Sequence, residues 1–197
     1  MQKAFHPKIF ARRRSTTALN TLRAFYFRSG KAFPDIDQFV EDTKRRYNIR
    51  IVTLRGNVKE ACFELKRQNP EIEAVFMGTR KCDLLHFGRQ NGLQLDGSTF
   101  DMTMKTDTDW PPYLRVYPLL KWDYAYVWDF LVNLRVPYCK LYDEGYTSLG
   151  DYNNTAKNPA LKFLDESGRV VYKPAYELRD GTLERASRIS SPKKCDI

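Results

Sequence analysis

Three short apolar stretches read LRAFYF at residues 22–27, IRIVTL at 49–54 and AVFMG at 74–78. The first and third are mostly apolar and the second alternates, as strands of a sheet do. Between them apolar residues recur at helical spacing, after Pro34 and again after Asn57, two residues that suit the start of a helix. Strand, helix, strand, helix, strand is the order of βαβ units. The sequence therefore predicts an α/β fold with a Rossmann-like parallel sheet.

The pattern changes after the third stretch. Residues 81–112 hold few apolar side chains and are rich in Asp, Thr and Gly. We expect an irregular segment there, just past the carboxyl end of a strand, where open α/β sheets bind ligands. A further strand is predicted at 115–120, a helix at 123–134 and a short helix at 182–188.

The net charge of +9 is concentrated at the start of the chain. Residues 1–31 contain eight Lys or Arg and no acid, so the remainder is close to neutral. A basic leader on a near-neutral domain does not resemble a nucleic-acid-binding surface, and we expect no nucleic acid as a partner. We divide the chain into residues 1–20, a basic leader or non-native start, and a domain of residues 21–197. The leader fits a mitochondrial transit peptide as well as it fits a non-native start.

Composition also bears on location and metal chemistry. No run approaches the roughly 20 apolar residues that cross a bilayer, and the start lacks the apolar stretch of a secretory signal. We therefore expect no membrane partner and a cytoplasmic location, or the mitochondrial matrix if the leader is a transit peptide. Four scattered cysteines predict free thiols, and two histidines do not support a structural zinc site.

A series of phrases from Met77 onward identifies a family. In order they read MGTR with Asp83, TD followed by DWP at 106–111, VPYCKLYDEGYTSLG at 136–150, NNT at 153–155, NPAL at 158–161 and TLERASR at 182–188. The series resembles eukaryotic FAD synthases (FMN adenylyltransferases), in their domain related to PAPS reductases. Any one phrase is weak, but the ordered set is specific. The resemblance implies a Rossmann-like parallel sheet of the adenine nucleotide alpha hydrolase, or PP-loop, type.

The chain departs from that family near its start. Family members begin with a strand and a Ser-Gly-Gly-Lys-Asp-Ser-like loop that cradles the phosphates of ATP. Here the stretch RSGK at 28–31 is short and follows the wrong strand. We expect the first strand and its phosphate-binding loop to be missing. Backbone N–H groups at a helix N-terminus hold a triphosphate, so triphosphate affinity is expected to be low.

The resemblance implies adenylyl transfer from ATP to FMN, giving FAD and pyrophosphate, with Mg²⁺ assisting. Such a reaction needs positioning and charge neutralisation rather than a protein nucleophile. FMN and ATP are then the small-molecule partners, and flavoproteins are candidate clients. The missing loop supports two alternatives: a catalytically inactive flavin-binding or regulatory family member, or a truncated fragment.

Candidate phosphate-handling residues lie in two of the phrases. Gly78 and Arg80 follow a predicted strand and, by resemblance, belong to the ATP side, while Asp83 is a candidate for the catalytic centre. From the residues alone, Arg80 and Asp83 equally suit a structural ion pair. Arg185 and Arg188 would share one face of a short helix and suit a cluster of phosphate oxygens. Spacing alone favours a solvated basic tail, whereas the family's C-terminal Arg pair matches both residues, so we assign them catalytic roles.

Candidate flavin-binding residues are Asp107, Trp110, Arg115 and Asn154. An indole can lie against an isoalloxazine ring, a carboxylate can accept from its N3–H, and Arg can meet its carbonyls. A Trp beside two prolines is by itself more often a packed loop anchor, and the family's Asp-x-x-Trp-Pro pattern raises the flavin interpretation. Asn154 follows a loop bounded by Gly145 and Gly150, which suits either a ligand loop or a structural turn. We predict no protein metal site.

Overall fold

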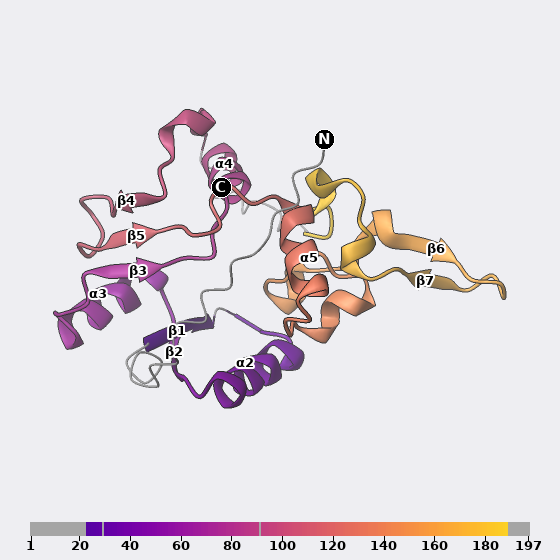
Figure 1. Cartoon of the computed structure of the whole chain (residues 1–197), viewed down its shortest axis with the longest axis horizontal. Helices are drawn as coiled ribbons and strands as arrows, with labels where there is room; N and C mark the ends of the chain where they lie inside the picture. Colours follow the sequence, from indigo (N-terminus) through magenta and orange to yellow (C-terminus); the bar gives the residue numbers. More distant parts are fainter. Residues whose placement is uncertain (1–22, 29, 91, 189–197) are drawn as a thin grey trace, which may run out of the picture.

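A computed structural model describes residues 23–28, 30–90 and 92–188 of the chain. Its first half alternates strands and helices as the apolar pattern predicts (Figure 1). The order is β1 (Arg23–Arg28), α2 (Pro34–Tyr47), β2 (Arg50–Arg55), α3 (Val58–Gln68) and β3 (Ala74–Phe76). The predicted leader, residues 1–20, lies outside the described residues.

Local side-chain chemistry sets the ends of these helices. Pro34 occupies the first turn of α2, and Asn48 ends the helix in a left-handed conformation with φ of 48°. The side chain of Asn57 accepts hydrogen bonds from the backbone N–H groups of Lys59 and Glu60 and so caps α3. The predicted helix-starting roles of Pro34 and Asn57 are therefore confirmed.

The strands pair as an α/β fold requires. β1 and β2 are parallel, and β3 is parallel to β5 (Leu114–Val116). β4 (Thr103–Lys105) pairs antiparallel with the other edge of β5. The prediction of an α/β fold with parallel pairing is confirmed, although within the described residues the hydrogen bonds form two ladders rather than one.

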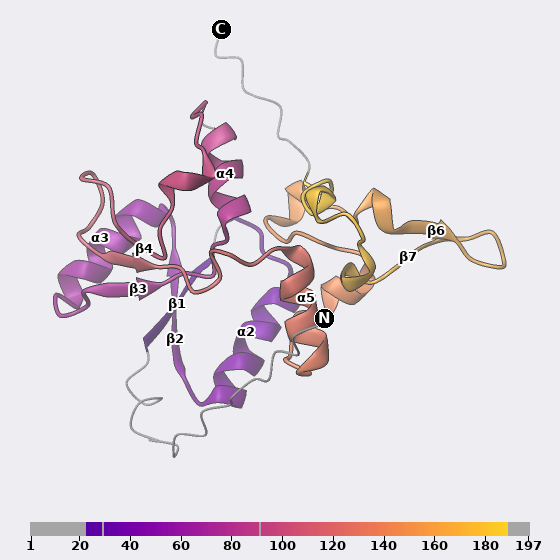
Figure 2. The same cartoon turned by 45° about the horizontal axis from the view of Figure 1, so that its top comes forward.

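The two ladders lie side by side at their amino ends. Arg23, the first residue of β1, donates hydrogen bonds to Asn69 and Glu71, which precede β3. Figures 1 and 2 both show β1 and β2 next to β3. The expectation of a missing first strand concerns residues outside the described part of the chain, so it stays a prediction.

The prediction of an irregular segment at 81–112 is wrong in part. It contains α4 (Lys81–Gln90), a 3-10 turn at Gly97–Thr99 and β4. Apolar residues are scarce over 81–112 as a whole, but α4 itself holds Leu84, Leu85 and Phe87, and a hydrogen bond from the backbone N–H of Arg80 to the Asp83 side chain marks its start. Asp96 similarly caps the 3-10 turn by accepting from the N–H of Ser98.

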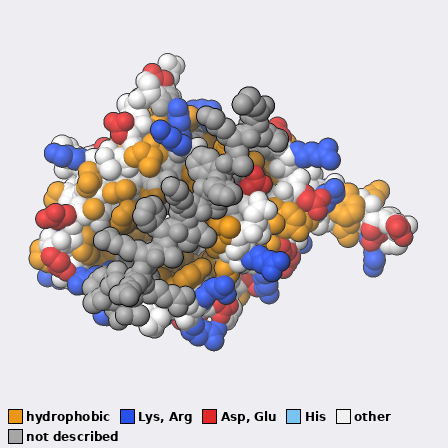
Figure 3. All heavy atoms as spheres, viewed as in Figure 1, with side chains coloured by type: hydrophobic (Ala, Val, Ile, Leu, Met, Phe, Trp, Pro, Cys, Tyr) orange, Lys and Arg blue, Asp and Glu red, His pale blue; other side chains and the backbone are white. Residues whose placement is uncertain are grey.

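The second half of the chain gathers around α5 (Tyr124–Asn133), which Asp123 caps by accepting from the N–H of Tyr126. A hairpin of β6 (Lys162–Leu164) and β7 (Val170–Tyr172) projects from this half (Figure 2). Figure 3 shows hydrophobic side chains along the hairpin. Short 3-10 turns make up much of the remainder, at Lys140–Glu144, Tyr152–Asn154, Pro159–Leu161, Ala175–Glu177 and Gly181–Leu183.

The best-buried core lies in this second half rather than under the strands. It is formed by Tyr124, Trp128, Leu161, Ala175 and Leu178. No residue of β1, β2 or β3 is fully buried, and Phe76 of β3 is 74% exposed. The mostly apolar stretch that forms β1 is therefore only partly buried, because ladders of two and three strands are too narrow to bury both faces. None of the described helices is long and apolar enough to span a bilayer.

Trp128 should be the residue on which this core depends. Its side chain is 6% exposed and makes edge-to-face contacts with four tyrosines, Tyr124, Tyr138, Tyr142 and Tyr176. We expect Trp128→Ala to lower the free energy of unfolding by about 3–5 kcal/mol, measured by urea denaturation. Tyr126→Ala, on the same helix but 64% exposed, should cost well under 1 kcal/mol. Equal losses in the two variants would contradict this assignment of the core.

Candidate phosphate-binding site

The site begins where β3 ends and α4 starts. Asp83, in the first turn of α4, accepts a hydrogen bond of 2.9 Å from the backbone N–H of Arg80. The same carboxylate accepts from the Arg80 guanidinium at 3.1 and 3.2 Å. This arrangement resembles the acidic half of a capping box, so one carboxylate starts the helix and also fixes the guanidinium. The N–H of Lys81 donates to Leu120 beyond β5, which holds this end of the sheet together.

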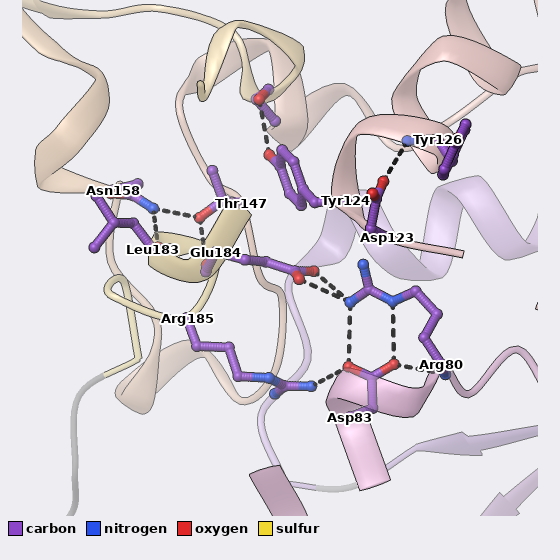
Figure 4. Close-up of polar contacts among 11 residues, drawn as sticks. Arg80, Asp83, Asp123, Tyr124, Tyr126, Thr147, Asn158, Leu183, Glu184 and Arg185 are labelled. Carbon is purple, nitrogen blue, oxygen red and sulfur yellow. Dashed lines mark hydrogen bonds and ion pairs between the residues drawn. The ribbon is translucent and has the colours of Figure 1, made fainter. Parts of the chain in front are cut away.

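Two residues from the far end of the chain complete the cluster (Figure 4). Glu184 accepts two hydrogen bonds from Arg80, at 2.7 and 2.9 Å. Arg185 donates to Asp83 at 2.8 Å. Two cations and two carboxylates are thus joined in one network, and the Arg80 side chain is only 9% exposed. Such a network is compact and close to neutral.

Burial and hydrogen bonding oppose each other in this network. Desolvation alone would raise the pKa of Asp83, but hydrogen bonds from Arg80 and Arg185 lower it below its ordinary value. Desolvation is the larger effect on Glu184 and raises its pKa. It would likewise lower the pKa of Arg80, but the two carboxylates outweigh it and raise that pKa. Asp83 is therefore held ionised, whereas Glu184 is the carboxylate that protonates more easily.

A buried hydrogen-bond network holds the segment that carries Glu184 and Arg185. Asn158 is 0% exposed and donates hydrogen bonds to the hydroxyl of Thr147 and the carbonyl of Leu183. The Thr147 hydroxyl donates in turn to the carbonyl of Glu184 at 2.6 Å. These bonds tie the loop at 145–150 to the C-terminal segment, so for Thr147 the structural-turn interpretation is the one that the geometry supports.

Arg188 lies in a different setting from Arg185. Its guanidinium donates to the hydroxyl of Thr155 at 2.9 Å and to the side-chain oxygen of Asn154 at 3.4 Å. Both acceptors are neutral, and no carboxylate within the described part of the chain forms an ion pair with it. Desolvation lowers the pKa of Arg188, and the nearby charge of Arg185 lowers it further. Arg188 is thus a partly buried cation that no carboxylate of the described residues neutralises.

Gly150 allows Arg188 this position. A Cβ added to Gly150 would overlap the guanidinium of Arg188. Gly150 is therefore needed so that the Arg188 guanidinium can approach its backbone closely. The backbone conformation of Gly150 does not itself require a glycine.

The predicted short helix at 182–188 is wrong. Only Gly181–Leu183 forms a 3-10 turn, and Arg188 pairs with Thr155 in an isolated β-bridge. The hydrogen bonds of Asn158 and Thr147 to this segment's carbonyls compete with helix formation. As a result Arg185 and Arg188 do not share a helix face: one reaches Asp83, the other Asn154.

Three of the four predicted flavin-binding residues are close to one another. The N–H of Trp110 bonds to the carbonyl of Asp107 in one turn, and Asp107 forms an ion pair with Arg115 at 3.8 Å. The buried Nε of Arg115 has no hydrogen-bond partner in the described structure. Lys59 of α3 lies 5.9 Å from the centre of the Trp110 ring. Asn154 is not part of this group, because it contacts Arg188 and Thr155 instead.

The flavin candidates and the arginine cluster lie toward opposite ends of β5. The turn at 107–110 joins β4 to the start of β5, whereas Leu120, beyond the end of β5, bonds to Lys81. Gly78 lines a small cavity of about 170 Å³ together with Arg80, Tyr124, Tyr142 and Glu184. The structure thus brings Gly78, Arg80, Asp83 and Arg185 together, and it separates them from Asp107, Trp110 and Arg115.

The described residues contain no group of three His, Cys, Asp or Glu side chains that could hold a metal ion. Asp83 is the carboxylate nearest the cluster's centre, and each of its oxygens already accepts two hydrogen bonds. A carboxylate offers about four lone-pair positions, so no position is left on Asp83 for Mg²⁺ in this arrangement.

Comparison with known proteins identifies the family. The model of the phosphoadenosine phosphosulfate reductase domain matches residues 2–157. The chain belongs to this domain family. Within the family it is similar to a probable FAD synthase of Caenorhabditis elegans, with 41% identity over 167 residues, and to one of Schizosaccharomyces pombe, with 36% over 170 residues. These alignments cover 85% and 86% of the chain, but 30% and 58% of the relatives.

Solved structures of this family show the same fold. The FMN adenylyltransferase of Candida glabrata in complex with FAD and inorganic pyrophosphate matches with a TM-score of 0.73 and 26% identity. That match covers 85% of this chain and 67% of the other. A yeast FAD synthetase in complex with FAD matches with a TM-score of 0.68 and 27% identity, over 88% and 71% of the two chains. The predicted FAD synthase resemblance and PP-loop type of fold are confirmed.

Sequence reasoning missed Glu184 and Asn158 as parts of the site, and it placed Thr147 only in a loop, between Gly145 and Gly150, that suits either a ligand loop or a structural turn. All three stand inside the phrases that carry the resemblance. A signal was available for Glu184, which is an acid directly beside a candidate phosphate-binding arginine. No local signal specified the partners of Thr147 and Asn158, which lie 37 and 25 residues further along the chain.

The opposite pKa shifts of the two carboxylates should be visible in the pH dependence of stability. The pKa of Asp83 is lower in the folded than in the unfolded state. Its contribution to the free energy of unfolding is therefore complete above about pH 4 and is lost as the pH falls through the folded pKa. We expect Asp83→Asn to flatten the loss of stability in acid, and to cost on the order of 2 kcal/mol at pH 7 because Glu184 still neutralises Arg80.

Glu184→Gln provides the comparison of opposite sign. The pKa of Glu184 is raised on folding, so its ionisation opposes folding as the pH rises through the folded pKa. The free energy of unfolding is measured with urea from pH 3 to 7. In this variant its decrease toward higher pH should disappear, while its decrease toward lower pH should remain. Exposed Asp101→Asn serves as the control. Identical profiles for all three variants would contradict the assignment.

Proposed function

We propose that this chain carries the adenylyl-transfer site of an FAD synthase, in which an FMN phosphate oxygen attacks the α-phosphorus of ATP. A new P–O bond joins the two nucleotides, the bond between the α- and β-phosphates breaks, and pyrophosphate leaves with those electrons. The reacting phosphates are ionised, so no protein nucleophile or base is needed. The observation that carries the proposal is Arg188, a partly buried cation without a carboxylate partner in the described residues.

A phosphate group fits the position of Arg188. A charged guanidinium in a desolvated setting is stabilised by an anion, and planar guanidinium groups match phosphate oxygens. The charge of Arg185 lowers the pKa of Arg188, so an anion bound at Arg188 also lies in the field of Arg185. Asp83 holds Arg185 in place, and Arg80 and Glu184 hold Asp83 and the C-terminal segment.

The similar proteins support the same chemistry. Relatives named as FAD synthases, and a solved FMN adenylyltransferase that holds FAD and pyrophosphate, share this fold with the chain. We extend FMN and ATP from those proteins to this one. Gly78 and Arg80 are the proposed ATP contacts, and proteins that require FAD are the proposed recipients of the product.

The flavin ring is assigned to Asp107, Trp110 and Arg115. The unpartnered Nε–H of Arg115 suits a ring carbonyl, and the Trp110 indole offers an aromatic face. Asn154 contributes at the phosphate end instead, because it contacts Arg188. We propose that Mg²⁺ enters as the counter-ion of ATP, since Asp83 has no lone pair left for it.

Removal of the Arg188 guanidinium should abolish most of the transfer activity. We expect Arg188→Ala to reduce the rate of FAD formation from FMN and ATP–Mg²⁺ by roughly a hundredfold, since a charge-stabilising donor is lost. Arg188→Lys should recover part of it. Arg169→Ala removes a guanidinium on an 80% exposed side chain and should leave the rate unchanged. FAD is measured by chromatography, and an unchanged rate in Arg188→Ala would overturn the role of Arg188.

Gly150→Ala tests the same site without removing a charge. The added Cβ would displace the Arg188 guanidinium, so this variant should lose activity to a similar extent. Two other glycines make poor controls. Alanine at Gly168 would be strained because its φ is +76°, and Gly78 has open space around it but is a proposed ATP contact. Ala160→Gly, in an exposed turn, provides a control for a small change of size. Wild-type activity in Gly150→Ala would show that Arg188 need not occupy this position.

The inactive flavin-binding alternative makes a different prediction. Separate calorimetric titrations of FMN and ATP–Mg²⁺, followed by an assay of the mixture, distinguish the two. FAD formation supports the transferase. Binding of FMN without ATP binding or turnover would replace the proposal with a flavin-binding function.

A further inference from the structure

The loop that carries Gly150 and Asn154 is hydrogen-bonded to a second loop, which joins β1 to α2. The backbone N–H of Lys31 donates to a carboxylate oxygen of Asp151 at 2.7 Å, and the N–H of Tyr152 donates to the carbonyl of Lys31 at 2.7 Å. The first of these bonds joins residues 120 positions apart in the sequence. Two hydrogen bonds in opposite directions fix the position of one loop relative to the other.

Gly30 and Phe33 make this contact between the two loops close. Gly30 has a φ of +54°, a conformation that favours glycine, and a Cβ added there would overlap a carboxylate oxygen of Asp151. Phe33 is 4% exposed, and its ring packs against that of Tyr152 with 4.9 Å between the ring centres. The contact therefore depends on a tight fit of the two backbones and on a buried ring, in addition to the hydrogen bonds.

The other carboxylate oxygen of Asp151 bonds within its own loop. It accepts from a backbone N–H two residues further along, at 2.9 Å, and so caps the 3-10 turn Tyr152–Asn154. That turn carries Asn154, whose side-chain oxygen accepts from the guanidinium of Arg188. Gly150, the residue before Asp151, is the one whose missing Cβ makes room for the same guanidinium. Asp151 therefore lies between two residues that contact Arg188.

We infer that Asp151 is a positioning residue, which holds Arg188 where the reacting phosphates meet it. The inference rests on the proposed function of Arg188. One oxygen of Asp151 holds the turn that presents Asn154 to the guanidinium, and the other holds this loop against the backbone of Lys31. Within the described residues Arg188 is oriented by neutral acceptors, so its position depends on how firmly they are held. A displacement of about 1 Å at such a site can cost roughly a hundredfold in rate.

Two substitutions break the contact from opposite sides. Asp151→Asn keeps an oxygen that can cap the turn but places an NH₂ group against the N–H of Lys31, so it removes the bond between the loops. Gly30→Ala leaves the carboxylate intact and displaces it with the added Cβ. One control is Asp165→Asn, which alters a carboxylate that caps the turn of the β6–β7 hairpin in the same way. The other is Gly168→Ala, which has the same left-handed strain, with φ of +76°, and no atom within 4 Å of the added Cβ.

The first measurement is the rate of FAD formation in a double-mutant cycle with Arg188→Ala. We expect Asp151→Asn and Gly30→Ala to lower kcat by about tenfold, with the KM for FMN and for ATP within about threefold of wild type. In the Arg188→Ala background neither should lower kcat further, because the effects of residues that act through one group do not add. Both controls should keep the wild-type rate. Additive losses, or equal losses in the controls, would show that Asp151 does not act through Arg188.

A measurement without substrates keeps this inference apart from the proposed function. The Nε–H signal of Arg188 is followed by NMR in the full chain and assigned by its loss in Arg188→Lys, and a dispersed spectrum confirms that each variant is folded. We expect the signal to shift in Asp151→Asn and Gly30→Ala and to stay in place in both controls. Such a shift without any FAD formation by the wild type supports the link to Arg188 and overturns the proposed function. FAD formation with an unmoved signal overturns the role of Asp151 and leaves the function standing.

Discussion

The contact between Arg80 and its two carboxylates is the constraint on which the site depends. Asp83 starts α4 and orients Arg80, and Glu184 brings the C-terminal segment against that same guanidinium. Each residue alone would be a charge removed from water, which costs several kcal/mol, so the cluster is stable only when it is complete. The start of α4, the position of the guanidinium and the docking of the C-terminal segment are therefore coupled through the Arg80 side chain.

This coupling explains why two neighbouring arginines have different characters. Arg185 is neutralised by Asp83 and belongs to the framework. Arg188 is held by Thr155 and Asn154, which satisfy its geometry but not its charge. Within the described residues, a cation without a carboxylate partner thus lies beside a balanced network, a pre-organised arrangement for negative charge that arrives with a ligand.

Much of the fold could be predicted from the sequence because the deciding signals are local. Pro34, Asn48 and Asn57 set helix ends within a few residues of themselves, a mostly apolar run marks β1 and apolar alternation marks β2. α4 was missed because residues 81–112 were judged by their overall composition, although Leu84, Leu85 and Phe87 and the Asp83 hydrogen bond at the helix start are local signals. The helix expected at 182–188 fails for a different reason: Asn158 and Thr147 take up the carbonyls that a helix would use.

The site was only partly predictable for the same physical reason. Arg80 and Asp83 are three residues apart and their pairing could be anticipated, as could the proximity of Asp107 to Arg115. The contact of Glu184 with Arg80 spans 104 residues, and no local pattern specifies it. The placement of Asn154 with Arg188, rather than with the flavin candidates, likewise depends on tertiary pairing.

The separation of 104 residues between Arg80 and Glu184 also bears on the order of folding. A contact between distant residues must overcome a large entropy of loop closure, so it forms after the local helices and hairpins. On a ribosome, Arg80 and Asp83 emerge long before Glu184 is synthesised, and until then they have only each other as partners. Completion of the site is therefore tied to completion of the chain, and a nascent or C-terminally unfolded molecule holds no assembled cluster.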